Sequence, residues 1–336
     1  DAIVRQQFEG VRWSLPAHVY SRPRQLHQGL PLEPTTLKRE LTVRGYRKDT
    51  QAISPGTFSL MGNRCTVYLR GFNGMQGRVP PVRVQVDFSQ GHITALTADN
   101  GSNLAKALLE PLRLGSILPL RHEDRAPVVL HDVPPLLLQA LLVMEDRRFM
   151  DHTGIDPLGV MRALLQNLRS GRVVAGGSTL TQQLAKNLYL DSGRTWRRKA
   201  NEAVMALLLE WRYSKSEILQ AYVNEVFLGQ SGNRAIHGFA LASEHYFGRP
   251  LGELPMPALA LLAGMVKAPS AYDPRRHPKR ARQRRNLVLA ELARAEQIDP
   301  QNLAKLQDAP LGLVVAPGAT HGSGSAFFDY VRRQIQ

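Results

Sequence analysis

The stretch LLVMEDRRFMDHTGID, residues 141–156, joins an apolar helical pattern to a dense group of ionisable side chains. If the helix continues through Phe149, Glu145 ends an apolar stripe close to the helix C-terminus. Partial burial and the negative end of the helix dipole would both raise the pKa of that carboxyl group. Such a residue suits a general base or acid that works near neutral pH. The alternative is a frayed helix end, where Glu145 pairs with Arg147 or Arg148 in solvent.

Outward from this stretch, helical periodicity fills a long part of the chain. From about Leu118 onward, apolar residues recur at i, i+3 and i+4 between Gly, Pro and Ser boundaries. This pattern predicts an all-α domain over residues 118–316. The run APGATHGSGSA, residues 316–326, follows it and has the composition of a flexible linker.

The region before the helical domain, residues 21–112, has a different pattern. Short runs that alternate apolar and polar residues are rich in Val, Tyr, Phe and Thr and are separated by glycines. SQGH, residues 89–92, lies between two such runs and is typical of a hairpin turn. A short amphipathic helix, capped by Thr35 or Thr36 and ending before Gly45, precedes them. We therefore expect a small α+β domain of four or five strands.

The composition limits the classes of function. The chain has 336 residues, a formal net charge of +15 and one cysteine. The charge predicts attraction to an anionic partner such as nucleic acid, a membrane surface or a phosphate-bearing substrate. One cysteine excludes an internal disulfide framework and a cysteine-rich metal site. No stretch has the ~20 apolar residues that span a bilayer, and we expect the chain to be part of a longer protein.

A second cluster of candidate residues lies in AGGSTLTQQLAKN, residues 175–187. Two glycines precede Ser178 or Thr179 as a helix N-cap, and Thr179 with Gln182 has the spacing of a capping box. Backbone N–H groups at such a helix start can bind an anion such as a phosphate, and Lys186 follows two turns later. A well-capped ordinary helix explains the same residues equally well.

A third cluster lies in RTWRRKANEAVMALLLEW, residues 194–211. Arg198 and Lys199 are helical neighbours of Glu202 at spacings of four and three residues. The face that carries Arg198 and Glu202 continues into apolar residues, so this ion pair points toward the core. Buried pairs of this kind often belong to a functional site. The alternative is an ion pair that extends into solvent at a helix end.

The run RRHPKRARQRR, residues 275–285, holds seven Lys or Arg residues and no acid. This charge would suit nucleic acid or membrane phosphates. A solvated face of a basic helix is the alternative, and the run alone does not separate them.

Five segments, in order, resemble the motifs of the peptidoglycan glycosyltransferases, glycosyltransferase family 51. These segments are EDRRFMDHTGID, GGSTLTQQLAKN, RRKANEAVMALLLE, ILQAYVNEVFLGQSGNRAIHGFALASEHYFG and LALLAGMVKAPSAYDP. The resemblance covers residues 118–316 and implies a lysozyme-like, all-α glycosyltransferase domain.

The rest of the chain resembles parts of the bifunctional class A penicillin-binding proteins of the 1b type. Residues 21–112 look like their small regulatory domain, which is similar to domain 2 of the nucleotide-excision-repair helicase subunit. Residues 1–20 would be a linker from a membrane anchor. Residues 317–336 would be a linker and the start of a transpeptidase domain, which the chain lacks.

The resemblance implies the polymerisation of lipid II into β-1,4 glycan strands. Glu145 would be the general base that deprotonates the 4-hydroxyl group of the acceptor sugar. That oxygen would displace undecaprenyl pyrophosphate from the donor with inversion. Glu202 would be a second catalytic carboxylate, which supports this region or a divalent cation, Mg²⁺ or Mn²⁺. The chemistry itself would require no cofactor.

Further residues of this sequence match family positions that contact the substrate. Cationic side chains and a helix start would stabilise the leaving pyrophosphate; they are Lys186, Arg198, Lys199, Ser178 and Thr179. The other matched positions, which would bind substrate or shape the cleft, are Asp146, Phe149, His152, Gln182, Gln183, Asn187 and Lys267.

The resemblance also implies partners and a location. Lipid II, the nascent glycan strand and the membrane surface would be the partners, on the periplasmic side of the bacterial inner membrane. An outer-membrane lipoprotein activator would dock on residues 21–112, and nucleic acid would not bind. Residues 158–189 would form an amphipathic, partly membrane-embedded surface, although ordinary core packing is the alternative there.

Two other functions compete with polymerisation. A lytic glycosidase on the same fold would cleave glycan with a glutamic acid, but it would need no group of cations beside that acid. A binding module for nucleic acid or membrane would explain the basic run, but it has no use for Glu145 beside a phosphate site. Both are weaker explanations of the three clusters together.

Overall fold

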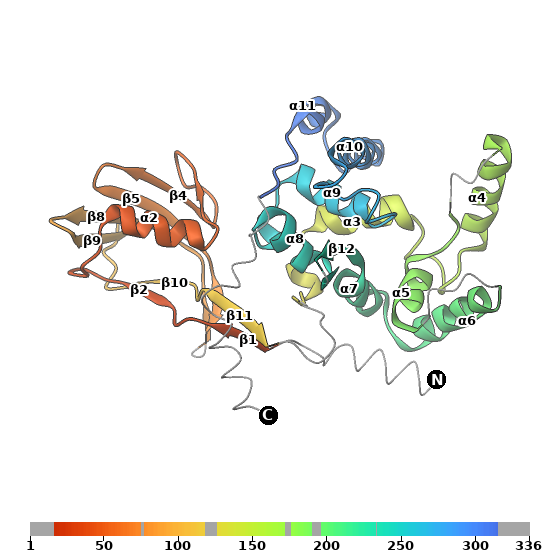
Figure 1. The fold of residues 1–336 in the computed structure, drawn as a ribbon, viewed down its shortest axis with the longest axis horizontal. Helices are drawn as coiled ribbons and strands as arrows, with labels where there is room; N and C mark the ends of the chain where they lie inside the picture. The colour runs from red at the N-terminus through yellow and green to blue at the C-terminus, as the bar shows by residue number, and fades with distance from the viewer. Residues whose placement is uncertain are drawn as a thin grey trace. The chain divides into compact units, whose positions relative to one another are not determined.

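The computed structural model describes residues 17–74, 77–117, 126–171, 176–189, 196–232 and 234–314. The described residues fall into two compact units, one within residues 17–117 and one within residues 126–314. The first unit is rich in strands and the second is mostly helical, as the sequence predicts (Figure 1). The predicted linker over residues 316–326 lies outside the described residues, as does the predicted tail after it.

The first unit is built around one five-stranded sheet with the order β3-β4-β5-β8-β9. β3 and β4 are parallel and the other neighbours are antiparallel. Three two-stranded pairs, β1–β11, β2–β10 and β6–β7, accompany it. The elements are β1 (Ala17–Tyr20), β2 (Arg24–Leu26), α2 (Pro34–Val43), β3 (Arg47–Lys48), β4 (Thr57–Met61), β5 (Arg64–Leu69), β6 (Phe72–Gly74), β7 (Gly77–Val79), β8 (Val82–Ser89), β9 (His92–Ala98), β10 (Ala107–Leu109) and β11 (Arg113–Ile117).

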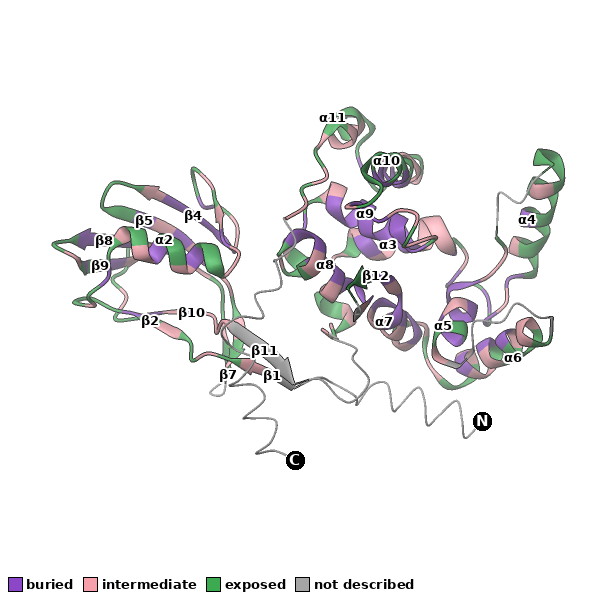
Figure 2. Cartoon of the chain, viewed as in Figure 1, coloured by how far each residue is buried: buried purple, intermediate pink, exposed green. Residues whose placement is uncertain are grey.

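Local sequence explains most of this unit. β8 and β9 form the predicted hairpin, and Gln90 and Gly91 turn the chain with φ of 50° and 76°. Alternate residues of the strands are buried and pack with Leu37 and Leu41 of α2, which lies on one face of the sheet (Figure 2). The expected threonine cap of α2 is wrong, because the helix begins at Pro34, whose fixed φ suits a first helical position.

One expected boundary also differs. Residues 17–20 were expected in a linker, but they form β1 and pair with β11. β1 is too short and irregular to give an alternating pattern, so the sequence carries no signal for it.

The second unit contains the helices that the sequence predicts and several that it does not. Its elements are η1 (Leu130–Asp132), α3 (Pro135–Glu145), α4 (Pro157–Ser170), α5 (Leu180–Tyr189), α6 (Trp196–Arg212), α7 (Lys215–Glu225), β12 (Phe227–Ser231), β13 (Arg234–His237), α8 (Phe239–Phe247), η2 (Leu251–Glu253), α9 (Met256–Met265), α10 (Pro278–Arg294), η3 (Pro300–Asn302) and α11 (Leu303–Asp308).

α9 lies at the centre of the second unit. Its residues from Ala258 to Met265 are buried, and α3, α8 and α10 pack around it (Figure 2). Gly264 permits the close approach of α10, since a Cβ there would lie 3.1 Å from Cγ of Arg284. Among the described helices, none is both long enough and apolar enough to span a membrane.

Three features differ from the prediction. The helix that carries Glu145 ends at Glu145 and does not continue through Phe149. The domain expected to be all-α contains the antiparallel hairpin β12–β13. The prediction of helix across this segment is therefore wrong. The basic run of residues 275–285 enters α10, which buries both Arg284 and Arg285.

Candidate active site

A cleft of about 660 Å³ in the second unit collects most of the residues singled out from the sequence. α3, α5, α6 and α10 contribute to its walls, and Phe227 at the start of β12 adds to the lining. The expected site residues that line this cleft are Glu145, Ser178, Gln183, Lys186, Asn187, Arg198, Lys199, Glu202 and Lys267. The other five, Asp146, Phe149, His152, Thr179 and Gln182, are buried.

Glu145 is the last residue of α3 and is mostly buried, with a side chain 11% exposed. Burial raises the pKa of its carboxyl group, while the hydrogen bond from Gln183 and the charges of Arg284 and Lys267 oppose that rise. The amide nitrogen of Gln183 donates to Oε2 at 3.1 Å. The raised pKa matches the expectation for a general base or acid.

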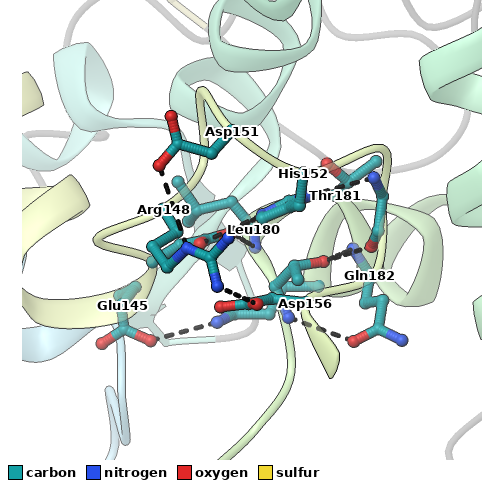
Figure 3. Close-up of polar contacts among 12 residues, drawn as sticks. Glu145, Arg148, Asp151, His152, Asp156, Leu180, Thr181 and Gln182 are labelled. Carbon is teal, nitrogen blue, oxygen red and sulfur yellow. Dashed lines mark hydrogen bonds and ion pairs between the residues drawn. The ribbon is translucent and has the colours of Figure 1, made fainter. Parts of the chain in front are cut away.

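The alternative of a frayed helix end is wrong. Arg147 pairs with Glu291 at 2.7 Å. Arg148 pairs with Asp156 at 3.1 Å and lies 3.9 Å from Asp151 (Figure 3). Neither arginine is the partner of Glu145, whose carboxylate therefore stays available to the cleft.

Asp146 anchors the segment that follows Glu145. Its buried carboxylate accepts hydrogen bonds from Nε2 of His152 at 2.9 Å and from the backbone N–H of Leu180 at 2.9 Å. Nδ1 of His152 accepts from the N–H of Gly154, so Nε2 carries the proton and donates. The ring of Phe149 meets that of His152 edge to face. These residues shape the site without lining the cleft.

The predicted capping box at the start of α5 is confirmed. Thr179 Oγ1 accepts from the N–H of Gln182, and Gln182 Oε1 accepts from the N–H of Thr179, both at 3.1 Å. Thr179 Oγ1 also donates to the carbonyl of Gly154 at 2.6 Å. Both side chains are therefore used within the protein, and they hold the helix start next to the cleft.

Glu202 forms the second charged group of the cleft. It is buried, it is ion-paired with Lys199, and Arg198 lies 3.8 Å from it. Lys199 also donates to Ser178 Oγ at 2.8 Å and so connects α6 to the start of α5. The predicted inward-pointing ion pair is therefore present.

Arg284 is a cleft residue that sequence reasoning missed. Its side chain is 7% exposed, and its Nη2 lies 3.8 Å from Oε1 of Glu145. Its Nε donates to the carbonyl of Gly264 at 3.0 Å. Among the described residues, five cationic side chains line the cleft; they are Lys186, Arg198, Lys199, Lys267 and Arg284. Two carboxylates, those of Glu145 and Glu202, line it as well.

A second cavity, of about 470 Å³, lies on another side of Glu145. α3, α4 and α10 and residues 176–179 line it. Met144, Glu145, Gly176 and Ser178 line both cavities, so Glu145 stands at the border between them. The arrangement presents a mostly buried carboxylate to two neighbouring cavities.

Comparison with known proteins gives the family. A family model described as "Transglycosylase" matches residues 113–293, which is more than half of the chain. The chain belongs to the transglycosylase family. A second model, "Bifunctional transglycosylase second domain", matches residues 26–109 of this transglycosylase.

The transglycosylase is similar to three curated proteins named penicillin-binding protein 1B. That of Vibrio cholerae is 46% identical over 290 residues, which are 86% of this chain and 37% of that protein. Those of Haemophilus influenzae and Escherichia coli are each 41% identical and cover 92% and 100% of this chain. The transglycosylase spans 40% of the length of each of these two.

The residues around Glu202 do not fit a divalent cation held by the transglycosylase. The carboxylate of Glu202 already pairs with Lys199 and lies near Arg198. In the described part of the chain, no group of three or more His, Cys, Asp or Glu side chains could hold a metal ion. Such cations take several oxygen ligands. We therefore derive no catalytic step through a metal.

Proposed function

We propose that this transglycosylase polymerises lipid II into the β-1,4 glycan strands of peptidoglycan in bacterial cell-wall synthesis. The position of Glu145 between two cavities is the observation that carries the proposal. Transfer of a sugar from a donor to an acceptor needs two neighbouring sites with the base between them. The cation-rich cleft suits the donor with its pyrophosphate, and the second cavity suits the acceptor sugar.

The reaction is a direct displacement. Glu145 takes the proton from the 4-hydroxyl group of the acceptor, and the oxygen forms a bond to the anomeric carbon of the donor. The bond from that carbon to undecaprenyl pyrophosphate breaks, so the configuration inverts. The raised pKa that burial gives Glu145 makes it a stronger base than an exposed glutamate.

The leaving pyrophosphate gains negative charge as its bond to the sugar breaks. Lys186 and Lys267 are exposed cations on the cleft, and Arg198 and Lys199 lie beside Glu202. Fixed positive charge aimed at a developing anion stabilises the transition state. A hydrolase would release a sugar hydroxyl rather than a pyrophosphate, so these cations favour the transferase over the lytic alternative.

Access to a lipid-linked substrate is consistent with the surface of α4. This helix exposes a row of large apolar side chains, each 47–70% exposed; they are Leu158, Val160, Met161, Leu164, Leu165 and Leu168. Arg162 and Arg169 lie on the same helix. An amphipathic helix of this kind lies in the membrane interface. This surface supports contact with a bilayer, and we propose that the protein works at the periplasmic face of the inner membrane.

The first unit is proposed as a docking platform for an outer-membrane lipoprotein activator. It has a hydrophobic core of its own and matches the family model for the second domain of bifunctional transglycosylases. All the candidate site residues predicted from the sequence belong to the second unit. A regulatory role therefore suits it better than a catalytic one.

Polymerisation of labelled lipid II in detergent, with products separated on a gel, tests the proposal. Wild type should give glycan ladders, Glu145→Gln none, and Lys186→Ala about 100-fold less glycan. Glu253→Gln, a carboxylate outside both cavities, is the matched control and should behave as wild type. Shortening of preformed glycan strands by the wild type, without synthesis, would support the lytic glycosidase instead.

A further inference from the structure

Tyr222 of α7 is completely buried and lines neither of the two cavities. Its hydroxyl group donates a hydrogen bond to Oε1 of Gln183 at 2.9 Å. Nε2 of Gln183 in turn donates to Oε2 of Glu145 at 3.1 Å. One chain of hydrogen bonds therefore runs from a buried phenol on α7, through α5, to the carboxylate at the end of α3.

The direction of this chain follows from the chemistry of its members. A side-chain amide presents either its oxygen or its NH₂ group to a neighbour, and its partners decide which. Burial raises the pKa of Tyr222 well above its ordinary value, so the hydroxyl group keeps its proton. That proton goes to Oε1 of Gln183, which leaves the NH₂ group for Glu145. The reversed amide would place its oxygen against the carboxylate.

We infer that Tyr222 is a positioning residue for the transfer reaction: it fixes the Gln183 amide so that the NH₂ group holds Glu145 as an oriented carboxylate. We call this chain of three residues the amide lock. The hydrogen bonds of the amide lock are independent of the proposed function. Its role in catalysis rests on the proposed function, because that function supplies the reaction in which Glu145 acts. Tyr222 touches no substrate site, so it acts through Gln183.

The lock offsets the effect of burial on Glu145. Burial raises the pKa of Glu145, and the neighbouring charge of Asp146 raises it further. Gln183, Arg284 from α10 and Lys267 after α9 oppose that rise. Arg284 is 3.8 Å away, whereas Gln183 makes a hydrogen bond. Loss of the fixed amide should therefore move the titration of Glu145 to higher pH.

Tyr222→Phe tests the lock, with Tyr246→Phe as the matched control. Tyr246 is also buried in the second unit, and its hydroxyl group donates to the carbonyl of Leu228 at 3.1 Å, away from Glu145. Two quantities are measured on the full chain. They are the titration of the Glu145 carboxyl group by ¹³C NMR without substrate, and the pH profiles of kcat and KM with lipid II.

In Tyr222→Phe, the Glu145 carboxyl should titrate at higher pH than in wild type, and the acidic limb of the kcat profile should move the same way. At neutral pH kcat should fall about tenfold, with KM changed less than about twofold. Tyr246→Phe should leave the titration and the acidic limb unchanged. An unchanged titration in Tyr222→Phe overturns the inference, even if kcat falls.

Gln183→Met keeps the inference testable if Tyr222→Phe does not fold. It removes the amide at similar volume, and it should also move the Glu145 titration to higher pH. Where Tyr222→Phe folds, its addition to Gln183→Met should cause no further shift of the Glu145 titration, and an additional shift would contradict the lock. A shifted titration together with a wild type that makes no glycan would uphold the lock and refute the proposed function.

Discussion

The carboxylate of Asp146 accepts a hydrogen bond at 2.9 Å from the backbone N–H of Leu180, the first residue of α5. Asp146 directly follows Glu145, and Gln183 lies one turn into α5. One contact therefore ties the end of α3 to the start of α5. It places the carboxylate of Glu145 and the amide of Gln183 against each other.

Asp146→Asn should destabilise the protein by about 2 kcal/mol, because two charge-assisted hydrogen bonds lose their ionised acceptor. Urea unfolding measures this loss. Asp132→Asn, at an exposed position in η1, should leave the free energy of unfolding within about 0.5 kcal/mol of wild type. Equal effects of the two variants would mean that the Asp146 contacts contribute little.

Glu145→Gln should raise the melting temperature at neutral pH while it abolishes catalysis. The folded-state pKa of Glu145 is raised, so its contribution to stability is full below the unfolded-state pKa and is lost as the pH rises through the folded-state pKa. The difference between variant and wild type should be small near pH 4 and should grow toward pH 8. Calorimetry across that range checks it, and a constant difference would contradict the raised pKa.

Gly154→Ala should cost about 3 kcal/mol of stability. Gly154 has a φ of +92°, and a Cβ there would lie 2.7 Å from the carbonyl oxygen of Ala206 in α6. Gly171 also has a positive φ, of +62°, but a Cβ there meets nothing within 4 Å. Gly171→Ala should therefore cost only about 1 kcal/mol. Chemical denaturation of both variants separates steric contact from backbone strain.

Stability should fall as the pH drops from about 6.5 to about 4, in part because of His245. Burial, together with the charge of Arg275, lowers the pKa of His245 to about 4. Arg275 Nη1 lies 2.6 Å from Nε2, which accepts its hydrogen bond as long as the ring is neutral. In the unfolded chain the histidine binds its proton near pH 6.5. As the pH falls below that value, proton binding therefore stabilises the unfolded state relative to the folded state. His245→Gln should show a shallower loss of melting temperature over this window.

Leu164→Glu with Leu168→Glu should weaken binding to vesicles that contain anionic phospholipids. Both side chains lie on the exposed apolar surface of α4, at 52% and 70% exposure. Sedimentation with vesicles measures the bound fraction. Val43→Glu replaces an apolar side chain of similar exposure, 62%, on α2 of the first unit. It should leave binding unchanged, and equal losses would argue against α4 as the membrane contact.

The sequence predicts the helices and the site where the pattern is local. The capping box at Thr179 and the inward pair of Arg198 with Glu202 depend on spacings of three and four residues, which a single helix fixes. Arg284 was missed for the opposite reason. In a run of seven basic residues, nothing in the sequence marks the two that the fold buries, and only the proximity of Arg284 to Glu145 of α3 identifies Arg284 as a cleft residue.

The hairpin β12–β13 was missed on similar grounds. Its strands, Phe227–Ser231 and Arg234–His237, are too short to show alternation, and the first follows a helix without a break in apolar content. The hydrogen bond that the backbone N–H of Leu180 donates to the Asp146 carboxylate joins residues 34 apart. The sequence predicts that the segments containing Asp146 and Leu180 both belong to a site. It does not predict their contact, because that contact depends on tertiary packing.

The surroundings of Glu145 come from four separate parts of the chain, with Gln183, Tyr222, Lys267 and Arg284 as their members. A ribosome makes Glu145 long before it makes Arg284. Until α10 has been synthesised and has docked, α3 ends in an ordinary carboxylate that no neighbour has desolvated. The proposed catalytic base is therefore a product of completed folding, and we expect an unfinished chain that already carries the EDRRF segment to remain inert.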